Sequence, residues 1–277
     1  MVLKKLFLIL IFNFLFSDEL HLTNGSILKG KIIEKSEESV SISIKFSDSN
    51  EQIILVNISE IEKIIYDDSD LNSKYLYNDP NKSRYFFSPS AFEIGGGETY
   101  FRNTWVFFSS FGRGLSDHLS VEGGMSIFPG GDLENQIKLF SLKVNSSNYT
   151  DLTNLRFAAG VFYIGVFEGG SGFIFGTSTL GESDDNFSIS LGLGYSRAEG
   201  NVELARDMTI ILCRKQRLSK SIALISENWL IPGVDQIFSN TGIRFFGKNL
   251  SADFSGIFLL SEYFGMPMPM LSISYRF

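Results

Sequence analysis

The chain ends with Leu271-Ser272-Ile273-Ser274-Tyr275-Arg276-Phe277, a stretch that alternates apolar and polar residues without a break. Successive side chains of a β-strand point to opposite faces, so the four apolar residues share one face and the three polar residues share the other. The stretch therefore predicts a strand that has one face in an apolar medium.

The two aromatic residues of this ending give it a resemblance to a known class. With Tyr275 two positions before a terminal Phe277, it resembles the closing strand of bacterial outer-membrane β-barrels, which their barrel assembly machinery reads as an insertion signal. The resemblance implies an all-β, antiparallel up-and-down barrel of porin-like type in the bacterial outer membrane. It also implies outer-membrane lipid and the assembly machinery as partners, but it indicates no solute.

The first residues, 1–17, have the pattern of a secretory signal peptide. Lys4 and Lys5 precede an apolar run from Leu6 to Phe16 that only Asn13 interrupts. A transmembrane anchor is the alternative interpretation, but this run is too short to cross a hydrocarbon layer of about 30 Å. We expect cleavage near Ser17 and export.

Composition limits the classes of function. The net charge of −7 argues against nucleic acid as a partner. Glycine and phenylalanine are abundant, at 26 and 27 residues, which suits twisted strands with an apolar outer face. No apolar stretch after the signal approaches the 18 residues of a spanning helix, so a closed barrel is the expected way to cross a bilayer. The single cysteine, Cys213, is expected to be a plain apolar strand position.

Residue composition and periodicity divide the remaining residues into three parts: a small periplasmic β module at 18–66, a linker at 67–83 and the barrel at 84–277. In the module we predict strands at 20–23, 27–34, 40–46, 52–56 and 61–66. Its opening, Leu22 to Gly30 with a turn at Asn24-Gly25, resembles SH3-like or Sm-like small barrels of bacterial envelope proteins. The alternative is a β module of no particular family. Such a module is a candidate to bind a periplasmic partner.

Alternating segments from Arg84 onward predict twelve strands, or ten if the first is only a lead-in. The spacing of about 16 residues per strand and turn suits strands of roughly 10 residues that cross a bilayer at a tilt. The predicted strands are 84–94, 99–111, 117–128, 136–146, 153–167, 171–181, 186–197, 206–214, 220–231, 240–247, 249–260 and 269–277.

The two faces of several predicted strands separate cleanly. Between Phe187 and Ser196, for example, apolar residues alternate with serine and glycine, which predicts a lipid face and a lumen face. The segment from Ser221 to Trp229 cannot be oriented in this way. Charges on the lumen side either pair across the lumen or line a constricted pore, and pairing is favoured because a buried unpaired charge costs several kcal/mol. The predicted lumen charges are Glu122, Arg156, Glu227, Arg244, Asp253 and Arg276.

No site for chemistry emerges from the sequence, so we predict no enzymatic activity and no cofactor. The two histidines, His21 and His118, lie in the N-terminal module and at a predicted periplasmic turn, where neither can reach an extracellular rim. The acidic cluster Asp67-Asp68-Ser69-Asp70 lacks the glycine and distal glutamate of a calcium loop. The methionines of Met266 to Met270 have an ordinary apolar explanation, with soft-metal binding as the alternative.

Tyrosine and tryptophan residues mostly fall near predicted strand ends. There they would form the aromatic girdles of a membrane protein, with an aromatic ligand cage as the alternative. These residues are Tyr100, Trp105, Tyr149, Tyr163, Tyr195, Trp229, Tyr263 and Tyr275.

Together these patterns predict an outer-membrane β-barrel that acts as a narrow porin-like channel or as a structural barrel. The alternative function is a plugged barrel for adhesion or envelope tethering, with the N-terminal module bound to a periplasmic partner.

Overall fold

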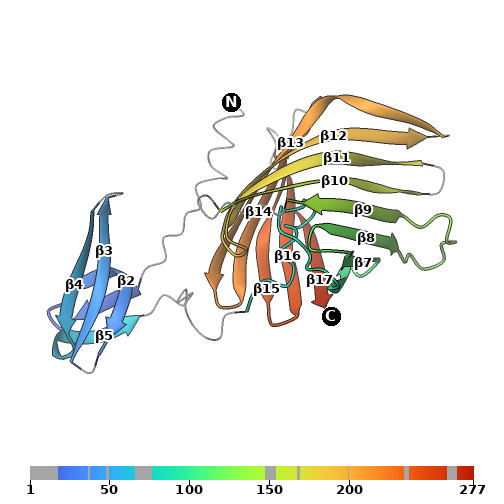
Figure 1. Ribbon diagram of the computed structural model, residues 1–277. Helices are drawn as coiled ribbons and strands as arrows, with labels where there is room; N and C mark the ends of the chain where they lie inside the picture. The colour runs from blue at the N-terminus through green and yellow to red at the C-terminus, as the bar shows by residue number, and fades with distance from the viewer. Residues whose placement is uncertain are drawn as a thin grey trace. The chain divides into compact units, whose positions relative to one another are not determined.

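The computed structural model contains two compact units, Met1–Leu76 with Leu218–Lys220 and Tyr77–Arg217 with Ser221–Phe277 (Figure 1). Apart from one short 3-10 helix, all regular structure in the described residues is β-strand, as the sequence predicts. No helix within those residues is long and apolar enough to cross a membrane. The structure describes residues 18–36, 38–47, 50–65, 77–146, 154–166, 169–198, 200–233, 237–260 and 267–277.

The N-terminal unit is a five-stranded antiparallel sheet. Its elements are β1 (Asp18–Leu22), β2 (Ile27–Lys35), β3 (Ser39–Ser47), β4 (Asn50–Asn57), η1 (Ile58–Glu60) and β5 (Ile61–Ile65). The strand order is β4-β3-β2-β1-β5, and Leu20 on β1 is opposite Leu28 on β2 and Ile64 on β5. Leu20, Val40 and Ile42 are fully buried at the centre of its core. The five predicted strands are confirmed, while the likeness to SH3-like or Sm-like barrels stays a prediction.

Twelve strands of the second unit form a closed antiparallel barrel, which confirms the predicted fold class. The barrel closes where β17 pairs with β6, with Tyr275 opposite Phe101. The strands are β6 (Thr99–Thr104), β7 (Phe108–Gly114), β8 (Leu119–Ser126), β9 (Lys138–Asn145), β10 (Leu155–Val166), β11 (Gly169–Gly181), β12 (Asn186–Ala198), β13 (Asn201–Ser219), β14 (Ile222–Leu230), β15 (Ile237–Phe246), β16 (Leu250–Leu260) and β17 (Met268–Arg276).

One end of the barrel carries both the C-terminus and the start of β6. The Phe277 N–H donates to the Thr99 carbonyl at 2.8 Å, and the Arg276 N–H donates to the Asn249 carbonyl in the β15–β16 turn at 2.8 Å. We call this the C-terminal end. The wall is uneven in height, because β6 and β7 contain 6 and 7 residues whereas β12 and β13 contain 13 and 19. Figure 1 shows the long β12–β13 hairpin.

Two predicted strands differ from the structure, although the count of twelve is correct. Residues 84–94 do not form a strand, because the serine-rich segment contains Pro89, which has no N–H for a ladder. Its Tyr85, Phe86 and Phe92 are all buried rather than alternating in exposure. The predicted strand 99–111 is two strands, β6 and β7, because a turn at 105–107 reverses the chain.

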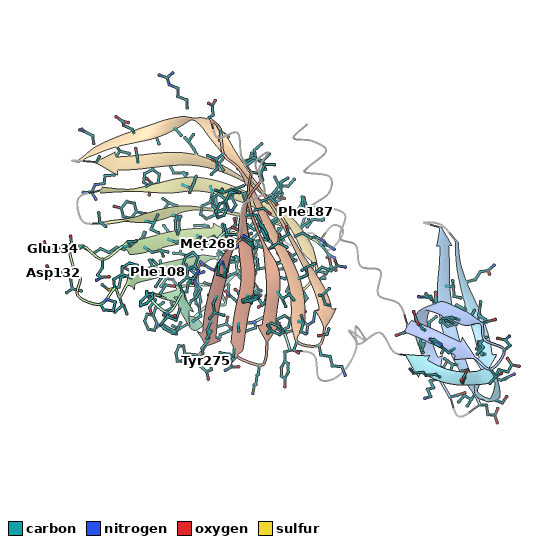
Figure 2. The ribbon with its side chains drawn as sticks, turned by 180° about the vertical axis from the view of Figure 1, so that it is seen from behind. Phe108, Asp132, Glu134, Phe187, Met268 and Tyr275 are labelled. Carbon is teal, nitrogen blue, oxygen red and sulfur yellow. The ribbon has the colours of Figure 1, made fainter. Side chains whose placement is uncertain are left out.

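The predicted separation of apolar and polar faces is confirmed on the wall. On β12, Ile189 and Leu191 are 45% and 48% exposed on the outer surface, while Ser188 and Ser190 are fully buried toward the interior. On β17, the outward Tyr275, labelled in Figure 2, is 42% exposed, and the inward Ser274 is buried. The barrel is therefore apolar outside and largely polar inside.

Several predictions fall outside the described residues. They concern the signal peptide at 1–17, the acidic linker residues Asp67 to Asp70, and Tyr149, Tyr263 and Met266.

Candidate functional site in the barrel interior

Residues 77–97 run into the barrel and back to the same end, and we call them the plug. The plug enters at the C-terminal end, where the Tyr77 carbonyl accepts a hydrogen bond from Arg217 Nη2 at 2.8 Å. It returns to the same end, where the Gly97 N–H donates to the Gly114 carbonyl at 2.9 Å. Between these points it folds back on itself, since Tyr85 N–H donates to the Ser88 carbonyl and Ser90 N–H to the Ser83 carbonyl. The plug is thus an internal hairpin-like loop whose tip is residues 85–88.

A buried charge network holds the first part of the plug. Oδ2 of Asp79 lies 2.6 Å from Lys215 Nζ and 2.9 Å from Arg244 Nη1. Arg244 also pairs with Asp253 on the neighbouring strand, at 2.6 and 3.0 Å. Its remaining N–H groups donate to plug carbonyls, including that of Tyr85 at 2.7 Å. Two carboxylates face two cations here, so the charges balance, as burial requires.

A second network lies on the opposite wall. Glu122 on β8 accepts hydrogen bonds from Arg84 of the plug, from Arg102 on β6 at 2.9 Å and from Ser110 on β7 at 2.8 Å. Glu122 is 4% exposed, so its charge is compensated by protein groups rather than by water. Arg84 connects the plug to three wall strands through this single carboxylate.

Wall side chains also bind the plug backbone directly. Nζ of Lys143 donates to the carbonyls of Ser83, Ser90 and Phe92 at 3.0, 3.1 and 2.8 Å. The carbonyl and N–H of Ala91 are bound by Asn145 at 2.7 Å and by Thr179 at 2.9 Å. An irregular segment needs such partners, because buried backbone groups without hydrogen bonds are costly.

The plug tip sits in an apolar cluster that the barrel builds inside its own lumen. Tyr85 and Phe86 pack with Ile225 on β14 and with the buried Cys213 on β13. The Tyr85 hydroxyl also bonds Asn186 and Ser188, each at 2.6 Å. This cluster explains why the segment from Ser221 to Trp229 resisted orientation: Ala223, Ile225 and Glu227 face inward, and two of these inward residues are apolar.

Glu227 binds the tip through three consecutive backbone N–H groups. Its Oε2 accepts from Phe86, Phe87 and Ser88 at 3.0, 3.0 and 3.1 Å. Its Oε1 accepts from Trp229 Nε1 at 2.6 Å. Three successive N–H groups that converge on one anion form a backbone nest, and the carboxylate is fully buried within it.

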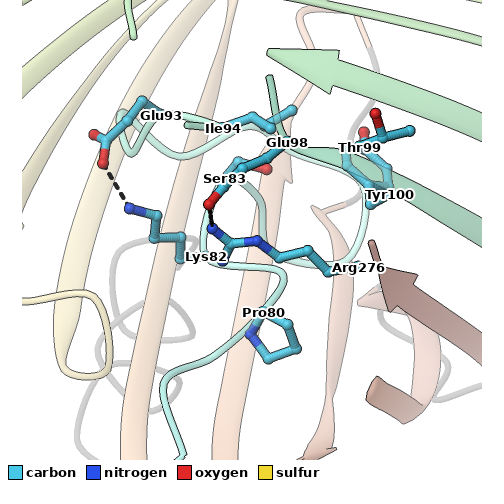
Figure 3. A pocket seen from close by; sticks show the side chains of 9 residues that line it. All are labelled: Pro80, Lys82, Ser83, Glu93, Ile94, Glu98, Thr99, Tyr100 and Arg276. Atoms are coloured by element: carbon cyan, nitrogen blue, oxygen red, sulfur yellow. Dashed lines mark hydrogen bonds and ion pairs between the residues drawn. The ribbon is translucent and has the colours of Figure 1, made fainter. Parts of the chain in front are cut away.

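The last two predicted lumen charges lie toward the C-terminal end. Arg156 stacks over the Phe92 ring, 4.5 Å from its centroid, and donates to the Gly181 carbonyl. Arg276 pairs with Glu98, and Lys82 of the plug pairs with Glu93, around a shallow pocket at this rim (Figure 3). The first pair joins the last strand to the residue that precedes β6, and the second pair lies within the plug.

Five of the six predicted charges thus interact with the plug or with the turns and carbonyls around it, and the sixth, Asp253, pairs with Arg244 on the wall. The sequence did not indicate their partners on the plug, Asp79 and Arg84, or the wall lysines Lys143 and Lys215. Alternation could have identified Lys143, since it shares the inward face of β9 with the buried Leu139 and Asn145.

The described residues contain no group of His, Cys, Asp and Glu side chains that could hold a metal ion. His21 lies on β1, and His118 lies in the β7–β8 turn at the C-terminal end of the barrel.

No protein-family model matches the chain, and none of the curated proteins matches it. A solved KdgM porin is 9% identical, with a TM-score of 0.46, and the match covers 65% of this chain and 99% of the porin. A KdgM porin in complex with disordered oligogalacturonate has a TM-score of 0.45 and is 9% identical. This match covers 65% of this chain and 98% of that porin. Salmonella typhi OmpF in complex with daunomycin gives 0.31 and 9% identity, over 94% of this chain and 95% of OmpF. Because these sequence identities and TM-scores are low, the assignment of the fold rests on the strand pairing described above.

Proposed function

We propose that this protein is a β-barrel of the bacterial outer membrane whose lumen is closed by its own plug, and that it anchors its N-terminal domain in the periplasm. The observation that carries the proposal is the plug itself. Wall side chains from β8, β9, β11, β13, β14 and β15 bind it. A barrel filled in this way serves better as a structural anchor than as an open channel.

The outer surface supports a membrane location. Large apolar side chains such as Phe111, Phe254 and Ile174 are 58%, 61% and 53% exposed on the wall. A belt of exposed apolar residues around a barrel is typical of a lipid-facing surface. The predicted signal peptide and the terminal Tyr275 and Phe277 agree with export and insertion into the outer membrane.

The path of the chain supports a periplasmic N-terminal domain. In the barrels that the last strand resembles, the C-terminus faces the periplasm. Tyr77 leaves the barrel at the end that also holds Phe277, so the residues before it would emerge on the periplasmic side. We propose that the domain of residues 18–65 binds a periplasmic partner there, and that the protein has no enzymatic activity.

The test combines location, conductance and partner capture. The protein should fractionate with the outer membrane and migrate differently on a gel before and after boiling. In planar bilayers the full chain should give no conductance steps, whereas a variant with residues 80–96 replaced by an equally long Gly-Ser segment should conduct. A variant that lacks residues 20–65 but keeps the plug is the matched control, and it should insert, remain silent and lose the periplasmic partner.

Conductance steps of equal size from the full chain and from the Gly-Ser variant would show an open porin-like channel and overturn the proposed closure. A heat-insensitive band in the soluble fraction would overturn the membrane location.

A further inference from the structure

A small cavity lies between the plug and the wall near the second charge network. Its polar lining comes from both parts of the molecule: Ser83 and Arg84 of the plug, Tyr100 on β6, Ser120 and Glu122 on β8, and Ser141 and Lys143 on β9. Ser120 and Ser141 are on the inward face of their strands. The cavity is thus bounded by cations and hydroxyl donors, with Glu122 as its one carboxylate.

The charges around this cavity do not balance. Arg84, Arg102 and Lys143 carry three positive charges, and Glu122 supplies one negative charge to that group. Nζ of Lys143 lies within hydrogen-bond distance of three carbonyl oxygens, a geometry that matches the three N–H groups of an ammonium. The nearest other carboxylate, Glu93, already pairs with Lys82 at 2.5 Å. An excess of positive charge therefore remains in a partly enclosed space.

One donor at the cavity has no acceptor. Within the described residues, Nε of Arg84 is buried and has no hydrogen-bond partner. The carboxylate of Glu122 already accepts three hydrogen bonds, from Arg84 Nη2, Arg102 and Ser110, and none of them comes from Arg84 Nε. A buried donor without an acceptor costs about 1–3 kcal/mol, so the arrangement calls for an acceptor that carries negative charge.

We propose that this cavity binds a small inorganic anion of the size of chloride. Arg84 Nε and the hydroxyls of Ser120 and Ser141 would donate to the anion, and Lys143 would supply a second positive charge beside it. The anion would neutralise part of the excess charge and would join the plug, through Arg84, to β8 and β9. Anion binding would then stabilise the closed barrel in a way that ionic strength alone does not.

The test compares anions at equal ionic strength with the full-length protein in detergent. Thermal unfolding in chloride or bromide should have a midpoint higher than in gluconate, by about 3–6 °C at an anion concentration tenfold above Kd. Arg84→Lys keeps the positive charge but lacks Nε, and Ser141→Ala removes a hydroxyl; both should reduce this difference. Ser255→Ala, a buried serine on β16 away from the cavity, is the matched control and should keep it.

Crystals grown in bromide give a second measurement that needs no variant. An anomalous peak beside Arg84, Ser120 and Ser141 would support the site. Equal midpoints in chloride and gluconate, or a cavity with water alone, would overturn it. A halide effect of equal size in Ser255→Ala, Ser141→Ala and Arg84→Lys would overturn it as well.

Discussion

Arg244 on β15 and Asp79 of the plug are joined inside the barrel, with Nη1 of the arginine 2.9 Å from Oδ2 of the carboxylate. Both side chains are fully buried, and Arg244 also holds Asp253 on the adjacent strand. The contact links residues 165 positions apart in the sequence. It ties the segment that precedes the first barrel strand to the wall near the last strands.

Replacement of Arg244 by methionine should lower the free energy of unfolding by about 3–5 kcal/mol, because it leaves the buried Asp253 without its partner. Denaturant unfolding in detergent or lipid measures the loss. Arg197→Met, at an exposed position of β12, is the control and should change stability by less than about 0.5 kcal/mol. In the double variant Arg244→Met, Asp253→Asn part of the loss should return, and strict additivity would contradict the pairing.

The hydroxyl group and the ring of Tyr85 should make separate contributions to the free energy of unfolding. Tyr85→Phe removes the hydroxyl bonds to Asn186 and Ser188 and should cost about 1–2 kcal/mol. Tyr85→Ala also empties the apolar cluster and should cost about 3–5 kcal/mol. Equilibrium unfolding checks both values, and Tyr77→Phe at a 45% exposed position serves as the control. Equal losses for the two Tyr85 variants would mean that the ring contributes nothing.

The fold was predictable because every strand repeats one physical constraint. Apolar and polar residues alternate in segments such as Asn186–Ala198 because the barrel has an apolar exterior and a polar interior. Each further strand shows the same alternation and so supports the same prediction. Strand boundaries that no change in residue composition marks were not predicted. The turn at 105–107 holds Trp105 and Val106 at φ of 52° and 68°, values that bulky residues rarely adopt, so these residue types do not predict a turn there.

The plug was not predictable in the same way. An irregular loop that is buried on all sides has no period, and its partners are set by the closed wall around it. The alternation of inward and outward residues predicts that the wall charges Glu122 and Arg244 lie inside the barrel. Asp79, however, belongs to a predicted linker and Arg84 to a predicted strand. Only the closed barrel brings these four residues together in two networks.

A substitution at Gly114 tests whether the plug returns to the C-terminal end of the barrel. A Cβ at this position would lie 2.2 Å from the Gly95 carbonyl oxygen and 2.7 Å from that of Ile94, both of them backbone atoms. Gly114→Ala should therefore destabilise the protein by about 1–3 kcal/mol. Gly123→Ala is the matched control on β8, since its Cβ would meet nothing within 4 Å. Similar unfolding curves for the two variants would contradict the close approach.

Leu191 tests whether the outer face meets hydrocarbon. It lies near the middle of β12 and is 48% exposed. Arginine at the bilayer midplane costs about 2–4 kcal/mol, so Leu191→Arg should show this loss when folding into phospholipid bilayers is measured. Val202→Arg, on the exposed part of β13, should cost less than about 1 kcal/mol. A negligible cost for Leu191→Arg would place this face in water.

Glu227 is the residue on which release of the plug tip should depend. Glu227→Ala leaves the N–H groups of Phe86, Phe87 and Ser88 without their acceptor in an apolar surrounding, so the tip should leave its site and expose the lumen transiently. Glu227→Gln keeps a carbonyl acceptor without the charge and should release the tip less often. Single-channel recording should thus show brief steps for Glu227→Ala, rarer steps for Glu227→Gln, and none for the exposed control Glu203→Ala. Silence from all three variants, with wild-type stability for Glu227→Ala, would show that the nest does not hold the plug.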